Sequence, residues 1–281
     1  MKRRFTKNDA SELRDLFNKR IEKIDPNKEA ALALSGGTDS MTALLAMIDT
    51  GRHPRCYTFY MSGIISKDLL SARHACKYFG LDLTEIAVPS DIDTMYADIK
   101  RVIPLCENVK KTIVQCMIPW LYIYPAIKEE IIISGMGGDD FYATQRKLRV
   151  RYHREGDKSI LNDRKWYGDD LRFSEANIIR LADKYGKKHI DFYADENDKS
   201  IEAFLLQYSF DAINKPFDKY PSVVAYADYY EAEPLYRDQT EHSYQINSRL
   251  RDCHDRLLNS RYNRCGHKAI IGLYNQIARE L

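Results

Sequence analysis

The sequence lacks the patterns that mark membrane-spanning chains and disulfide-stabilised secreted chains. Its most hydrophobic stretch, Thr112 to Ile127, contains Gln115, Pro119 and Pro125 and is too short to span a bilayer. Its six cysteines form no C-x-x-C pair, which is typical of reduced and mostly buried thiols. The basic start, residues 1–4, leads into polar residues instead of an apolar signal segment. We therefore expect a cytoplasmic protein with no membrane partner.

A large excess of one charge sign is also lacking. Lysine and arginine number 43 against 41 aspartates and glutamates, for a formal net charge of +2. Such a balance does not imply a polyanionic partner for the chain as a whole. One local exception is the run from Arg146 to Arg154, where basic residues alternate with Leu, Val and Tyr. Two interpretations of this run stay open: a solvated surface, or a surface that binds nucleic acid.

Two common nucleotide-binding glycine patterns are missing as well. The chain has neither the Gly-Lys-Ser/Thr end of a Walker A loop nor the G-x-G-x-x-G of a dinucleotide-binding fold. It has instead an apolar strand-like run, the turn Ser35–Ser40 (SGGTDS), and an amphipathic helical segment. Backbone N–H groups freed by the two glycines, together with those at the helix start, predict a concave anion site. Three hydroxyl side chains in the turn add further donors.

A second glycine-rich segment, Ser134–Asp140 (SGMGGDD), follows the strand-like run 131–134. Paired carboxylates at the end of a parallel strand are suited to holding Mg²⁺ on ATP phosphates. The same cation explains Asp39 in the first turn, because a bare carboxylate and a phosphate repel each other. The alternative interpretation of both segments is a pair of ordinary connections with left-handed glycines, capping hydroxyls and solvated carboxylates.

Strand-like runs alternate with helical periods between residues 26 and 145. The strand-like runs are 30–34, 55–61, 83–88 and 131–134, and the helical segments are near 41–48, 66–79, 91–101 and 112–128. This alternation predicts an α/β fold with a doubly wound parallel sheet whose ligand lies at the carboxyl ends of the strands. We expect residues 1–25 to form a helix on this core (26–145), and residues 146–281 to form a mainly helical C-terminal region.

Together the two glycine motifs resemble the synthetase domain of asparagine synthetases and β-lactam synthetases, within the PP-loop ATP pyrophosphatases. The resemblance is good over residues 10–145 and weaker beyond, where Ile190–Leu206 resembles the family's C-terminal segment. It implies an adenine nucleotide alpha hydrolase-like fold and an enzyme that cleaves ATP to AMP and pyrophosphate. ATP and Mg²⁺ are the cofactors that it implies.

The resemblance also implies roles for individual residues. Contacts with adenosine are expected from Leu34, Met61, Ser134 and Gly135. Pyrophosphate contacts are expected from Ser35, Gly36, Gly37, Thr38 and Ser40, within an ATP-binding set that also includes Asp39. The expected Mg²⁺ ligands are Asp39 and Asp139.

The sequence departs from this family at two positions that bear on catalysis. Met136 stands where asparagine synthetases carry glutamate and β-lactam synthetases carry tyrosine, and a thioether neither takes up a proton nor donates a strong hydrogen bond. Gln239 stands near the place of the family's catalytic lysine, and a neutral amide stabilises developing charge less well. We expect Lys268 or Arg237 to substitute for that lysine.

These features predict a stand-alone ligase of the asparagine synthetase type. It would adenylate a carboxylate or a similar oxygen and transfer the activated group to ammonia or an amine. No cysteine directly follows Met1, so we expect no glutaminase domain, and nitrogen would come from free ammonia, a separate amidotransferase or an amine substrate. Two alternatives stay open: a PP-loop enzyme that modifies a nucleoside, a tRNA or a DNA base through Arg146–Arg154, and a nucleotide-binding regulator with altered catalysis.

Overall fold

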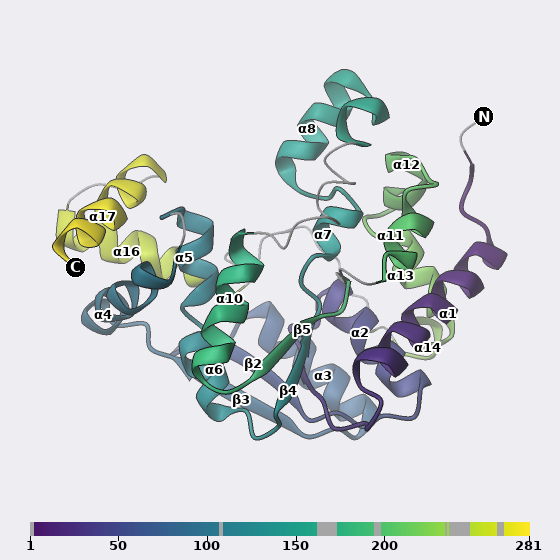
Figure 1. Ribbon diagram of the computed structural model, residues 1–281, viewed down its shortest axis with the longest axis horizontal. Coiled ribbons are helices and arrows are strands. Elements are labelled where there is room, and N and C mark those ends of the chain that lie inside the picture. Colours follow the sequence, from purple (N-terminus) through teal and green to yellow (C-terminus); the bar gives the residue numbers. More distant parts are fainter. Residues whose placement is uncertain are drawn as a thin grey trace. The chain divides into compact units, whose positions relative to one another are not determined.

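The computed structural model describes residues 3–106, 109–161, 173–193, 198–233, 235, 248–262 and 267–281, without the side chains of 173–176, 260–262 and 267–269. Five strands form one sheet in the order β3-β2-β1-β4-β5 (Figure 1). Their bounds are Ala31–Ala33 for β1, Cys56–Met61 for β2, Leu83–Val88 for β3, Ile131–Ser134 for β4 and Lys188–Asp191 for β5. The predicted α/β fold with a parallel sheet is confirmed. Within the described ranges no helix is long and apolar enough to cross a membrane.

Strand β5 is a strand that the sequence pattern does not reveal. It lies within the region that was expected to be mainly helical. Its two buried positions are His189 and Asp191, whereas Lys188 is exposed and Ile190 is half-buried. Because polar residues occupy the buried positions, the hydrophobic periodicity that identifies a strand is missing here.

The chain folds into two compact units, and each combines separate segments. The first unit consists of Met1–Arg55, Ile133–Leu171 and Ile190–Arg237; the second consists of Cys56–Ile132, Arg172–His189 and Asp238–Leu281. These boundaries differ from the division expected at residues 25 and 145.

Helix α1 (Lys7–Ile24) organises the first unit. It begins with a capping box between Thr6 and Asp9, which satisfies backbone donors at the helix start. Phe17 on its apolar face is fully buried and stacks on Tyr226, with ring centroids 6.3 Å apart. The other helices of this unit are α2 (Thr38–Asp49), α7 (Gly138–Phe141), α8 (Arg146–Glu155), α11 (Ser200–Leu205), α12 (Phe210–Asn214), α13 (Tyr220–Ala225) and α14 (Ala227–Ala232).

The second unit contains the parallel pair β2 and β3, with Cys56 opposite Leu83 and Met61 opposite Val88. The helix predicted over 112–128 is two helices, because Pro119 lacks the N–H that would continue the hydrogen-bond ladder. The helices of this unit are α3 (Lys67–Phe79), α4 (Ile92–Val102), the short 3₁₀ helix η1 (Ile103–Leu105), α5 (Lys111–Met117), α6 (Trp120–Ala126), α10 (Phe173–Lys184), α16 (Leu250–Tyr262) and α17 (His267–Glu280).

Two buried histidines of the second unit predict a loss of stability in acid. Burial lowers the pKa of His189 and of His254 from 6.5 to about 3, so the unfolded chain protonates these rings at a higher pH than the folded protein. Their stabilising effect is complete above the unfolded pKa and shrinks as the pH falls toward the folded pKa. The expected loss is about 1.4 kcal/mol per pH unit for each ring in that range, measured by urea unfolding between about pH 7 and pH 5.

The variant His189→Gln isolates one of these rings. It removes one site at which the unfolded chain takes up a proton, so the slope of unfolding free energy against pH should fall by about half. His53, which is exposed to water, provides the matched control His53→Gln, and this variant should keep the wild-type slope. Equal slopes in His189→Gln and the wild type would show that other groups determine acid stability.

Candidate functional site

The turn between β1 and α2 has the geometry of an anion cradle. Gly36 adopts a left-handed conformation with φ of +71°, and Gly37 is the N-cap of α2. The hydroxyl of Ser40 donates to the carbonyl of Gly37 at 3.1 Å and accepts from the backbone N–H of Ser35 at 3.2 Å. These bonds close the turn, so the N–H groups at the start of α2 lie together at the positive end of the helix dipole.

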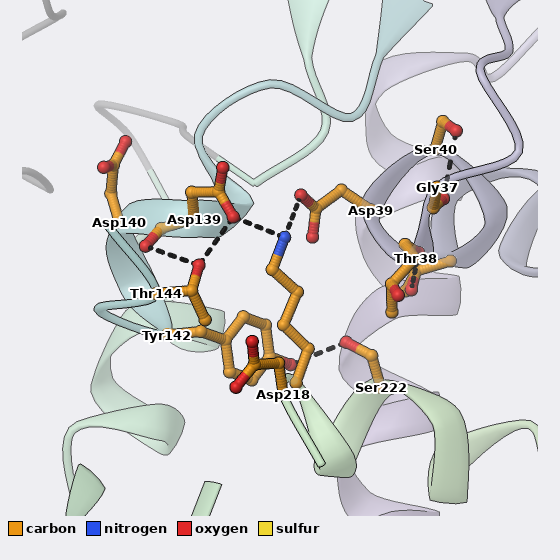
Figure 2. A network of polar contacts seen from close by, with 12 residues as sticks. Gly37, Thr38, Asp39, Ser40, Asp139, Asp140, Tyr142, Thr144, Asp218 and Ser222 are labelled. Carbon is orange, nitrogen blue, oxygen red and sulfur yellow. Dashed lines mark hydrogen bonds and ion pairs between the residues drawn. The ribbon is translucent and has the colours of Figure 1, made fainter. Parts of the chain in front are cut away.

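Two carboxylates and one ammonium form the centre of the site. Asp39 lies in the first turn of α2, and Asp139 lies in the first turn of α7. Figure 2 shows both carboxylates turned toward one nitrogen atom. Their ion pairs identify this atom as Nζ of Lys219, which is 2.6 Å from Asp139 and also pairs with Asp39. The Lys219 side chain is only 4% exposed, whereas that of Asp139 is 47% exposed. The cluster is therefore buried at the lysine and open to water at Asp139.

Burial and mutual charge set the ionisation of this cluster. Burial raises the pKa of Asp39 to about 6; Lys219 opposes the rise and Asp139 adds to it. Burial also lowers the pKa of Lys219, but the carboxylates of Asp139 and Asp39 outweigh that effect, so the net pKa of Lys219 is raised and the ammonium is retained. With all three groups ionised, two negative charges face one positive charge, and a further cation is electrostatically favoured.

The residues present fit a divalent cation. The Lys219 ammonium stands between Asp39 and Asp139 in the way that a metal ion would. The Asp39 Oδ1 atom is buried and has no hydrogen-bond partner among the residues that the structure describes. Carboxylate oxygens are the protein ligands that Mg²⁺ prefers, with phosphate oxygens and water completing its shell. Among the described residues no group of three or more His, Cys, Asp or Glu side chains is arranged for a metal. The expected pair, Asp39 and Asp139, is thus brought together.

The glycines of the second motif permit close approach to the first. A Cβ atom on Gly135 would lie 2.5 Å from the backbone nitrogen of Ser40, and a Cβ atom on Gly138 would overlap the carboxylate of Asp39. Gly137 adopts φ of +85°, a left-handed conformation that favours glycine. The segment therefore needs glycine for steric reasons that the sequence alone does not reveal.

Side chains that follow α7 hold Asp139 and Asp140 in place. The Thr144 hydroxyl donates to Asp139 at 2.6 Å, and the Gln145 amide donates to Asp140, which is buried. Arg149, in α8, donates from Nε to the carbonyl of Thr144 at 2.7 Å. The position of Asp139 thus depends on the start of α8.

Lys219 is the functional residue that sequence reasoning missed. It is the N-cap of α13 and adopts φ of +58°, an uncommon conformation for a residue with a side chain. The preceding Asp218 pairs with Arg149 of α8. Pro221 signals a helix start. No local sequence pattern, however, shows that the Lys219 side chain contacts Asp39 and Asp139.

The remaining predicted site residues fall into three groups. Leu34 and Ser134 are buried in the first unit. Met61 is buried at the end of β2 in the second unit. Arg237, together with Gln239, lies outside the described residues, and Lys268 lies in α17 with its side chain outside the description. The catalytic roles expected for Lys268 and Arg237 stay predictions.

Comparison with known proteins identifies one family. The family model described as asparagine synthase matches residues 12–261. No curated protein matches the chain significantly. Among solved structures, the chain is similar to the U34-tRNA thiolase NcsA from Methanococcus maripaludis with its 4Fe-4S cluster, at 12% identity, covering 96% of this chain and 80% of that chain, with a TM-score of 0.36. A likeness this weak supports no argument about this chain.

Two glycine substitutions should distinguish an effect on the stability of the fold from an effect on the candidate site. In Gly135→Ala the new Cβ meets backbone atoms of Asp39 and Ser40 that cannot move alone, so we expect destabilisation of about 1–3 kcal/mol in urea unfolding. In Gly138→Ala the Cβ displaces the Asp39 carboxylate. We therefore expect a smaller loss of stability than in Gly135→Ala. If Mg²⁺ and ATP together raise the melting temperature of the wild type, we expect that rise to be lost in Gly138→Ala.

Gly272 of α17 provides the control, because a Cβ there would have no atom of the described residues within 4 Å. Gly272→Ala should be neutral or stabilising by up to about 1 kcal/mol, since alanine favours a helix more than glycine does. If all three variants keep wild-type stability and the wild-type response to Mg²⁺ and ATP, the close approach of the two motifs is not a constraint.

Proposed function

Because the chain belongs to the asparagine synthase family, we propose that it is an ATP-dependent ligase that forms AMP and pyrophosphate. It activates a carboxylate, or a similar oxygen, as an adenylate and transfers the activated group to ammonia or an amine. The observation that carries this proposal is the convergence of Asp39, Asp139 and Lys219 beside the turn Ser35–Ser40. Cleavage between the α- and β-phosphates needs stabilisation of the departing pyrophosphate, and this cluster is suited to that task.

Each element of the cluster has a distinct role in the proposal. The N–H groups at the start of α2 and the hydroxyls of Ser35 and Ser40 bind the pyrophosphate portion of ATP. Asp39 and Asp139 would hold Mg²⁺, which neutralises phosphate charge when it is bound. Lys219, which lies on the same two carboxylates, donates to the oxygen atoms that gain charge as pyrophosphate leaves.

Met136 cannot transfer a proton to or from the nucleophile that attacks the adenylate. It lies between Gly135 and Gly137 in the turn that carries the acidic pair, and its thioether is neither a base nor a strong donor. The nucleophile must therefore arrive as a neutral amine or ammonia, or lose its proton to another group. For this reason we propose a substrate pair other than that of ordinary asparagine synthesis.

A second candidate function is modification of a nucleobase or nucleoside, with activation of a ring oxygen by the same chemistry. The specific observation in its favour is the cationic helix α8, which begins directly after the acidic pair. A regulator without catalysis is the third interpretation, and any substrate-dependent exchange between ATP and pyrophosphate would eliminate it.

Exchange of labelled pyrophosphate into ATP tests the proposed chemistry. We expect exchange that depends on one member of a panel of amino acids, other carboxylates and modified nucleosides, with AMP as the nucleotide product. Asp39→Asn and Asp139→Asn should each lower the rate of exchange roughly 100-fold or more, because each replaces a negatively charged metal ligand with a neutral amide. Asp15→Asn, at an exposed position of α1, is the matched control and should keep the wild-type rate. Formation of ADP and phosphate without AMP would contradict the proposal.

Removal of the Lys219 ammonium tests the metal site without turnover. Lys219→Met leaves two carboxylates facing each other without the cation, so we expect destabilisation of about 3 kcal/mol in EDTA. Added Mg²⁺ should restore much of this loss, because a bound ligand stabilises the folded state. The shift of melting temperature between EDTA and Mg²⁺ should therefore be larger in the variant than in the wild type.

Lys215→Met is the control for this experiment. Lys215 is 67% exposed and pairs with Asp211 on the surface of the same unit, so its loss should change stability by less than about 0.5 kcal/mol with or without Mg²⁺. If Lys219→Met and the wild type respond equally to Mg²⁺, the two carboxylates do not bind the metal.

A further inference from the structure

Helix α8 presents a cationic stripe to solvent. The exposed positions of this helix include the acidic Glu155 at its last residue. The other exposed positions are residues 146, 147, 150, 153 and 154, and at 3.6 residues per turn they lie on one side of the helix. They carry Arg146, Lys147, Val150, His153 and Arg154. No acidic residue belongs to this stripe, although the whole chain is nearly neutral.

The opposite side of α8 fixes the direction in which the stripe points. Leu148 is buried in a cluster with Ala143, Ile160 and Phe210. Tyr152 packs against Phe210 with ring centroids 4.2 Å apart. The helix is thus amphipathic: its apolar side packs on the first unit, and its cationic side faces water.

Two cations at the start of the stripe have no charged partner among the described residues. In the described part of the chain, neither Arg146 nor Lys147 forms an ion pair or a side-chain hydrogen bond. Arg154 pairs with its neighbour Glu155, at the far end of the helix. By contrast, Arg149 on the packed side is bound to Asp218. Cations that serve the fold are therefore paired, whereas those at the start of the stripe are available to a ligand.

We propose that this stripe binds the sugar-phosphate backbone of a nucleic acid. From Arg146 to Arg154 the helix rises about 12 Å, which is long enough to follow several phosphates of a strand. A membrane surface fits less well, because interfacial helices bury large apolar side chains and the stripe offers only Val150. A solvated surface without a ligand gives no reason for cations to gather on one side of one helix.

The stripe also lies next to the proposed ATP site. Gln145, the N-cap of α8, donates to Asp140, and Arg149 contacts both Thr144 and the Asp218 that precedes Lys219. A nucleic acid on the stripe is thus held by the same helix that positions the acidic pair. The acceptor of the activated group is accordingly a group carried on the nucleic acid. This last step rests on the proposed function, whereas binding by the stripe does not.

Binding is measured with the full chain, without ATP, by fluorescence anisotropy of a labelled RNA and a labelled DNA duplex of about 20 nucleotides per strand. We expect micromolar affinity at low salt and a linear decrease of log K with log salt concentration. The variant Arg146→Glu/Lys147→Glu should bind at least ten-fold more weakly, with a salt slope smaller by about 2. The two probes show whether the preferred backbone is RNA or DNA.

The control variant is Lys7→Glu/Lys19→Glu, which makes the same charge change at two exposed positions of α1 in the same unit. Its affinity should stay within about two-fold of wild type. Equal weakening by both variants, or by neither, would overturn the inference, as would binding to vesicles of phosphatidylserine and phosphatidylcholine with no binding to either nucleic acid.

The pyrophosphate-exchange assay separates this inference from the proposed function. If the protein binds nucleic acid through the stripe but shows no exchange with any substrate, the binding surface stands and the ligase proposal fails. If it shows exchange but binds neither probe, the ligase proposal stands and the binding surface is overturned. Exchange that requires the nucleic acid probe would support both.

Discussion

The pairing of the Lys219 ammonium with the carboxylates of Asp39 and Asp139 is the interaction on which the site depends. It joins three segments that are far apart in the sequence. Without a cation between them, two carboxylates at the carboxyl edge of the sheet would repel each other, and a buried charge without a partner is strongly destabilising. The ammonium therefore holds open a position that a divalent cation can share or take. In the proposed reaction, ATP and its metal would complete this charge arrangement.

Steric constraints around this pairing are as strict as the electrostatic ones. Gly135 lies against the backbone of the first motif, and Gly138 lies against the Asp39 side chain. The hydroxyl of Thr144 donates to Oδ1 of Asp139, the same oxygen that pairs with Lys219. A carboxylate that binds a metal must be held within a few tenths of an ångström, and packing by glycine achieves this without adding a polar group. Charge and close packing thus act on the same few atoms.

The parts of this structure that could be predicted from sequence are those encoded locally. The turn Ser35–Ser40 carries its own glycines, hydroxyls and helix start, so its chemistry is readable within six residues. The first four strands are rich in apolar and β-branched residues and lie where the pattern places them. Strand β5 could not be found because its buried positions are His189 and Asp191. Lys219 could not be found because its role arises only from tertiary contacts with Asp39 and Asp139.

The same reasoning explains why the acceptor is harder to identify than the ATP site. In the proposed reaction Asp39, Asp139 and Lys219 supply charge at the pyrophosphate. Such charge stabilises the leaving pyrophosphate whichever group attacks the α-phosphorus. Met136 supplies no proton transfer, so selectivity for the acceptor must come from binding and positioning. In our proposal helix α8 positions a large acceptor. Its Arg149 supports Asp139 through Thr144, and on its exposed side Arg146 and Lys147 have no charged partner among the described residues. An acceptor bound there would be oriented by the same helix that holds the metal ligand in place.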